Sequence, residues 1–184
     1  MKTFLNLLAN TLVATFTNTF VWFAATFWLF LETRSVIATS VMAGVYLGTV
    51  AISGFYLGSL VDRFPKKRVL LLSSLPSLAL FALAALVFRQ TPAAVFRDPT
   101  SPALWVFIVL ILVGAVAGNI RSIALTTLVT VLVPPERRDR ANGLIGTTNG
   151  VAFLLTSIFS GLAIGLLGIA WTLTIAVGVT VLVV

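Results

Sequence analysis

One short segment of this sequence brings together five charged residues that could act chemically. Asp62, Arg63, Lys66, Lys67 and Arg68 fall within seven positions, between two long apolar stretches. A carboxylate beside four basic groups can cap a neighbouring helix end or form a salt bridge to it. We therefore expect this segment to work through ion pairs rather than through bond-making chemistry.

One further arginine lies inside an apolar stretch. Arg121 is about 18 Å along a helix from Val133, at 1.5 Å per residue, which is near mid-depth in a hydrocarbon core about 30 Å thick. A buried guanidinium is costly, so it usually faces a cavity or a polar partner. Two roles are open: a ligand or coupling residue that binds an anionic or polar group, or a structural arginine satisfied by carbonyl groups or reaching toward a water-filled vestibule.

The residue types that are missing exclude several kinds of chemistry. The sequence contains no cysteine and no histidine. Disulfides, thiolate metal sites and histidine-based acid and base catalysis are therefore excluded. We expect no metal site, no cofactor and no enzymatic activity.

Composition indicates a membrane protein. Hydrophobic residues make up 59% of the 184 residues and charged residues only 9%, whereas a soluble protein is roughly 25% charged. The net charge of +7 does not indicate nucleic-acid binding, because the basic residues cluster at the ends of apolar stretches, as membrane topology predicts. The elements that position the charged segment are thus membrane-spanning helices, each of about 20 residues.

The apolar stretches predict six spans in a single helical bundle that takes up residues 1–184. Basic residues on alternate sides number eight against three, with Arg121 inside a span. The richer side is expected to be cytoplasmic, together with the N-terminus. The predicted spans are residues 4–30, 36–60, 69–88, 103–133, 141–167 and 169–184, with a minimal turn at Gly168 between the last two.

The segment between the second and third spans also has a recognisable order, Gly58-x-Leu60-x-Asp62-Arg63-x-Pro65-Lys66-Lys67. It resembles the G-x-L-x-D-R-x-G-R-K loop motif of the major facilitator superfamily, which joins the same two spans on the cytoplasmic side. It departs from that motif at Pro65, where the family usually has Gly. The alternative is a basic loop that only sets topology. The resemblance implies that the gating residues are Gly58, Asp62, Arg63, Lys66 and Lys67.

Polar residues at helical spacing in the first, fourth and fifth spans predict a polar cavity. In the family, spans one, two, four and five line the central cavity, while three and six face outward. For any single residue, hydrogen bonding between helices is the alternative role. The residues that we expect to contact substrate are Asn18, Asn119, Arg121 and Asn149.

The resemblance implies an all-α membrane fold, the N-terminal six-helix half of a major facilitator transporter. Such proteins rock two bundles about a midplane site. The implied function is secondary active transport of small molecules by alternating access. Efflux is favoured because residues 132–144 resemble the fourth-to-fifth span junction of efflux members. The expected location is the plasma membrane (the inner membrane of a bacterial cell), crossed several times.

The partners implied are the lipid bilayer, a small-molecule substrate, and either a missing C-terminal half or a second copy. The sequence stops in apolar residues at 180–184, where a last span usually carries polar or basic anchors. A truncated transporter, a non-transporting membrane scaffold and a self-dimerising half-transporter therefore stay open. Proton coupling also stays open, because no Asp or Glu lies within a predicted span and a proton carrier would have to lie in the absent half.

Overall fold

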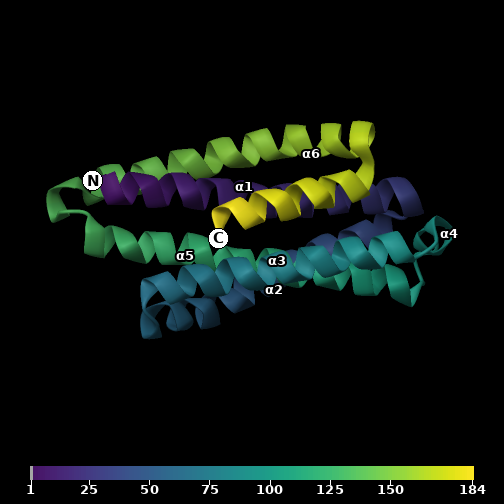
Figure 1. The fold of residues 1–184 in the computed structure, drawn as a ribbon, viewed down its shortest axis with the longest axis horizontal. Coiled ribbons are helices and arrows are strands. Elements are labelled where there is room, and N and C mark those ends of the chain that lie inside the picture. The colour runs from purple at the N-terminus through teal and green to yellow at the C-terminus, as the bar shows by residue number, and fades with distance from the viewer. Residues whose placement is uncertain (1) are drawn as a thin grey trace.

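The computed structural model describes the backbone of residues 2–184 and the side chains of residues 4–65 and 68–184. Within that part of the chain every regular element is a helix. Figure 1 shows the long helices side by side in an elongated bundle. The elements are α1 (Lys2–Thr33), α2 (Val36–Arg63), α3 (Lys66–Gln90), the short α4 (Ala93–Phe96), α5 (Pro102–Leu132), the 3₁₀ helix η1 (Pro135–Arg137) and α6 (Arg138–Val183).

The longest element, α6, is two helical segments joined by a break. Gly168 has φ 75° and ψ 173°, which lies outside the helical region and suits glycine because it has no Cβ. In Figure 1 the chain reverses direction near the end of this element, so its last part runs back along the bundle. The break occurs where the sequence predicted a turn.

Five of the described helices are long and apolar enough to cross a membrane: α1, α2, α3, α5 and α6, with both segments of α6 counted as one. The all-helical membrane fold is thus confirmed. Six separate crossings stay a prediction at this point.

The other connections have clear local causes. Between α1 and α2, Arg34 has φ 52°, and the side chain of Ser35 accepts a hydrogen bond from the Ala38 N–H (3.1 Å), so that it caps α2. Pro102 opens α5, where a missing N–H costs nothing. These local features determine where α2 and α5 begin.

The core lies between α1, α3, α5 and α6, and α2 is the least covered long helix. Half of the most apolar window of α5 is buried inside the bundle, against 11% for α2. On α5, Gly114 lets α3 approach closely, and the Ser77 Oγ of α3 lies 2.7 Å from the Gly114 carbonyl oxygen. A Cβ at Gly114 would come within 2.8 Å of the Phe81 ring.

One end of the bundle is closed by aromatic rings. The indole of Trp28 packs against Phe88, Phe96 and Phe107, with ring centroids 5.1–5.6 Å apart. Phe96 belongs to α4 and is 1% exposed, so this short helix is held to the bundle by its ring.

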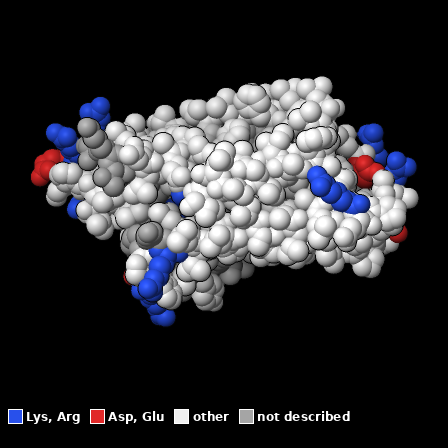
Figure 2. Space-filling view, viewed as in Figure 1, with Lys and Arg blue, Asp and Glu red and all other residues white. Residues whose placement is uncertain are grey.

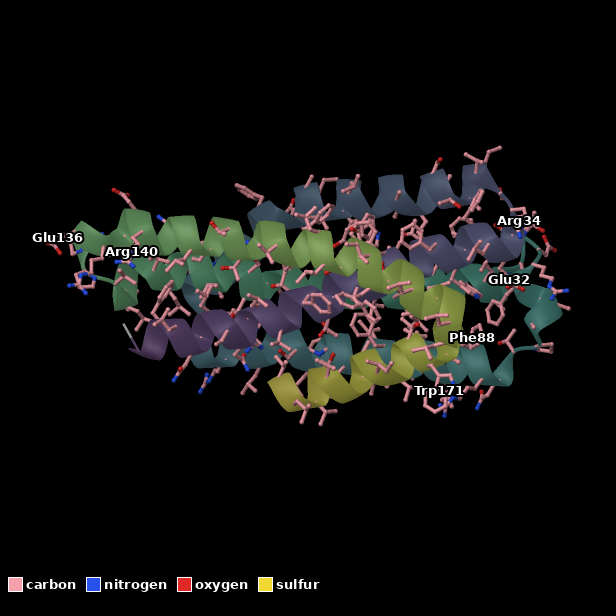
Figure 3. The ribbon with its side chains drawn as sticks, turned by 90° about the horizontal axis from the view of Figure 1, so that it is seen from above. Glu32, Arg34, Phe88, Glu136, Arg140 and Trp171 are labelled. Atoms are coloured by element: carbon pink, nitrogen blue, oxygen red, sulfur yellow. The ribbon has the colours of Figure 1, made fainter. Side chains whose placement is uncertain are left out.

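Apart from Arg121, the charged groups of the described residues lie toward the two ends of the bundle. Figure 2 shows Lys, Arg, Asp and Glu gathered at both ends of the visible face, with an uncharged belt between them. Figure 3 shows Glu136 and Arg140 at one end and Glu32 and Arg34 at the other. The connections from α2 to α3 and from α5 to α6 lie at the same end as the N-terminus (Figure 1), which agrees with alternate crossings.

Candidate functional site

The centre of the bundle contains a buried arginine with polar partners from two other helices. Arg121, on α5, is 5% exposed. Its Nη1 donates a hydrogen bond to the Ser74 hydroxyl of α3 at 2.6 Å, and its Nη2 donates to the Asn10 Oδ1 of α1. The Asn10 amide donates in turn to the Val183 carbonyl oxygen near the end of α6, at 3.4 Å. Arg121 therefore ties together four helical segments through side chains.

The amide of Asn18 packs against a glycine one turn away from this arginine. Gly118 of α5 lies so close that a Cβ there would overlap the Asn18 side chain, whose Oδ1 would be 2.6 Å away. Asn18 is 8% exposed. Both residues line a cavity of about 10 Å³ together with Arg121 and Ser73, which is barely enough for one water molecule.

A second polar group lies on the side of α5 that faces α2. The side chain of Asn119 lies next to the Tyr46 hydroxyl of α2. The Tyr46 ring stacks on Trp22 of α1, with centroids 4.7 Å apart and an interplanar angle of 23°. The Trp22 Nε1 is buried and has no hydrogen-bond partner among the described residues. This cluster combines aromatic faces, which can stack on a planar solute, with an unused donor.

The charged segment at residues 62–68 joins α2 to α3 at one end of the bundle. Asp62 and Arg63 are exposed in the last turn of α2, and Lys66 opens α3. A helix prefers cations at its C-terminus and anions at its N-terminus. The carboxylate of Asp62 and the basic first turn of α3 reverse that preference, so these charges do not stabilise their own helices. Among the described side chains, Asp62 forms no salt bridge.

Gly58 lies one turn before Asp62 on α2, and a Cβ at Gly58 would meet nothing within 4 Å. No neighbouring helix in the described structure uses the space that this glycine leaves. Lys66 and Lys67 belong to α3 by their backbone, and their side chains lie outside the described residues.

Comparison with protein families decides the class of the protein. The model of the Major Facilitator Superfamily matches residues 7–184. The chain belongs to the Major Facilitator Superfamily. No curated protein and no solved structure matches the chain significantly in the corresponding comparisons. As a member of this superfamily it is a multi-pass membrane protein of the transporter type.

The four cavity residues predicted for this superfamily member lie in three places. Asn18 and Arg121 line the same small cavity, and Asn119 faces α2. Asn149 is exposed on the first segment of α6. The structure thus brings two of the four together. That all four contact one substrate stays a prediction.

Sequence reasoning missed the polar partners of this centre. Asn10 and Ser74 bind Arg121 directly, and Tyr46 and Trp22 accompany Asn119. A polar residue in an apolar span was the available signal for Asn10 and Ser74, but serine and asparagine also serve as ordinary contacts between membrane helices. Among the described residues of this superfamily member, no group of three or more His, Cys, Asp or Glu could hold a metal ion.

Proposed function

We propose that this protein is a secondary active transporter that exports small molecules by alternating access, and that the 62–68 loop is its cytoplasmic gate. Family membership supports the transporter class. The observation that carries the gate is the placement of charge: Asp62 lies in the last turn of α2 and basic residues open α3, both against the helix dipoles, whereas Arg63 at the end of α2 is favourably placed. Because Asp62 and these basic residues do not stabilise their own helices, they are available for ion pairs with groups outside α2 and α3.

The proposed topology has six crossings. Residues 138–167 extend about 45 Å at 1.5 Å per residue, which is already the full thickness of a bilayer with its headgroups. The segment after Gly168 returns antiparallel to them as a sixth crossing. The eight basic residues of the sequence at the end that contains the 62–68 loop favour a cytoplasmic location for that end and for the N-terminus.

The proposed docking surface for a second six-helix bundle is formed by α2 and the first segment of α6. Both helices carry exposed large apolar side chains, such as Phe55 at 82% and Leu166 at 80%. Their glycines are equally uncovered, since a Cβ at Gly48 or at Gly150 would meet nothing within 4 Å. Glycines at membrane helix interfaces allow backbones to approach closely. The second bundle would belong either to the same polypeptide or to another copy of the chain.

The test of the gate is transport by the full-length protein in proteoliposomes. Asp62→Asn removes the carboxylate, and we expect it to lower the initial rate of substrate export several-fold without changing the amount of folded protein. The matched control is Asp139→Asn, the same chemical change at an exposed position in the first turn of α6. The gate is refuted if the two variants transport equally fast, and the transporter class of function is refuted if no candidate solute moves.

The alternative of a half-transporter made of two copies is favoured by the same uncovered surface. The chain has no cysteine, so a single Gly150→Cys introduces one reactive thiol on α6. Efficient disulfide crosslinking of two such chains in membranes indicates a dimer across this surface. If two such chains do not crosslink, a dimer that brings the two Gly150 positions together is refuted.

A further inference from the structure

An exposed arginine lies at one end of a groove between α3 and the second segment of α6, which run side by side (Figure 1). Arg89, in the last turn of α3, donates a hydrogen bond from Nη2 to the Thr174 hydroxyl of α6 at 3.4 Å. The Thr174 hydroxyl donates in turn to the Ala170 carbonyl oxygen at 2.8 Å. Thr174 therefore holds the guanidinium beside the groove, and the other N–H groups of Arg89 have no hydrogen-bond partner among the described residues.

The rest of the groove is apolar and long enough for part of a hydrocarbon chain. From Arg89 it extends along α3 to Ala82, seven residues away, which is about 10 Å at 1.5 Å per residue. Its volume is about 230 Å³, whereas one water molecule needs roughly 10–15 Å³ by the same measure. The residues that border it, at helical spacing on each segment, are Ala82, Ala85, Leu86, Arg89, Thr174 and Val177.

The polar end of the groove is at the depth of the lipid headgroups. Trp171 precedes Thr174 by three residues and is 63% exposed, and residues three apart are neighbours on a helix surface. Exposed tryptophans of membrane proteins are enriched where headgroups meet hydrocarbon. Figure 3 shows Trp171 at the end of the bundle that carries Glu32 and Arg34. The apolar part of the groove therefore extends from the headgroup region into the hydrocarbon region.

The groove is separate from the surface proposed for docking a second bundle. That surface is formed by α2 and the first segment of α6, whereas the groove lies between α3 and the second segment of α6. In Figure 3, α2 and the second segment of α6 lie along opposite sides of the bundle. With a second bundle on the proposed surface, the groove would still face lipid.

The charge at the groove is positive and has no counter-charge among the described residues. Arg89 forms no salt bridge within this part of the chain, and no residue that borders the groove is acidic. At the same end of the bundle, Glu32 is paired with Arg97, and Asp98 accepts hydrogen bonds from Thr100. The planar fork of a guanidinium matches the oxygens of a phosphate. The ammonium group of a zwitterionic headgroup, in contrast, would find no carboxylate at the groove.

We propose that this groove binds an anionic phospholipid. Its phosphodiester lies on Arg89, and the first part of one acyl chain lies along Ala82, Ala85 and Val177. A lipid fits better than a dissolved phosphate, because the apolar walls would gain nothing from a small anion and Trp171 places the arginine at the depth of the headgroups. The inference depends on the membrane class of the protein and not on the proposed transport.

The test is native mass spectrometry of the purified full-length protein in neutral detergent micelles, which have no charged membrane surface. Phosphatidylglycerol and phosphatidylcholine with the same acyl chains are titrated separately, and we expect phosphatidylglycerol to bind more tightly. Arg89→Gln should weaken its binding about fivefold, the contribution of one basic group near a membrane surface. The matched control is Arg34→Gln, which removes an exposed positive charge at the same end but away from the groove. It should bind the lipid like the wild type.

A second pair of variants tests the apolar part of the site. Ala82→Leu fills the groove and keeps Arg89, so it should weaken phosphatidylglycerol binding several-fold. Ala79→Leu makes the same change at an exposed position of α3 that does not border the groove, and it should leave the affinity unchanged.

The proposal is overturned if Arg89→Gln binds phosphatidylglycerol as tightly as Arg34→Gln does, or if Ala82→Leu binds it as tightly as Ala79→Leu does. Equal affinity of the wild type for the two lipids would also overturn it. Displacement of the lipid by dissolved glycerol 3-phosphate at equal concentration would identify a site for a free anion and would overturn the assignment to a lipid. Because none of these measurements involves transport, a failure of the proposed transport function would not affect them.

Discussion

The contact between Asn18 and Gly118 gives the sharpest prediction about stability. In Gly118→Ala the new methyl group would overlap the whole Asn18 amide, with the amide oxygen at 2.6 Å. The adjoining cavity of about 10 Å³ is too small to accept the displaced amide, so α1 and α5 must separate. Overpacking of this kind costs about 1–3 kcal/mol, and Ala in place of Gly in a helix returns about 0.5–1 kcal/mol. We expect a net loss of about 1–2 kcal/mol in the free energy of unfolding.

The measurement is unfolding of the purified chain in mixed micelles by titration with a denaturing detergent, followed by far-ultraviolet circular dichroism. Gly178→Ala, in the second segment of α6, is the control, because a Cβ there would meet nothing within 4 Å. It should be as stable as the wild type or up to about 1 kcal/mol more stable.

A double variant tests the cause of the loss. Asn18→Ala makes room for the methyl group, so Asn18→Ala/Gly118→Ala should be more stable than the sum of the two single changes predicts, by about 0.5–3 kcal/mol for residues in contact. The reasoning fails if Gly118→Ala matches Gly178→Ala in stability, or if the two single effects simply add.

Three further outcomes follow from the helix contacts and the loop at the aromatic end. Ser77→Ala removes the hydrogen bond to Gly114 and should lower the free energy of unfolding in the same detergent titration by about 0.6 kcal/mol, the average for such bonds between membrane helices. Phe96→Ala empties the space between α4 and the Trp28 cluster and should cost roughly 3 kcal/mol, with faster proteolysis of the α4 connection as a second readout. Hydrogen bonds from the Thr100 hydroxyl and N–H lower the pKa of Asp98 below its ordinary value of 3.8. The linked stability is therefore present above pH 3.8 and is lost as the pH falls through the lowered pKa; NMR titration should find this pKa, and Thr100→Ala should raise it.

The structural features that the sequence predicted correctly are those that depend on the composition of a single segment. Charge at helix ends, breaks at proline and glycine, and the length of apolar runs located the long helices and the turn at Gly168. The position of Arg121 predicted a buried group in need of polar partners, and the structure supplies them. Those partners are the Ser74 hydroxyl and the side-chain amide oxygen of Asn10.

The sequence could not predict which helix faces meet. In a soluble protein the apolar side of a helix marks the core, but in a membrane both the core and the lipid favour apolar side chains. The rotation of α1 that brings Asn10 to Arg121, and the rotation of α5 that turns Asn119 toward Tyr46, therefore have no signature in hydropathy. Small residues carry part of this information, yet Gly118 is packed against Asn18 while Gly48 meets nothing, and spacing alone does not separate the two cases.

The difference between packed and uncovered glycines indicates which helices stabilise the bundle and which surface is left for movement against a partner. Close glycine packing and the side-chain hydrogen bonds of Ser77 and Arg121 join α1, α3 and α5 through the core. The uncovered glycines of α2 and of the first segment of α6 take no part in them. A bundle built in this way can move as one body against a partner, because the surface proposed for docking contributes little to holding the bundle together. Substitution of Gly48 by Ala should then alter association without destabilising the chain, whereas substitution of Gly118 by Ala should destabilise the chain without altering association.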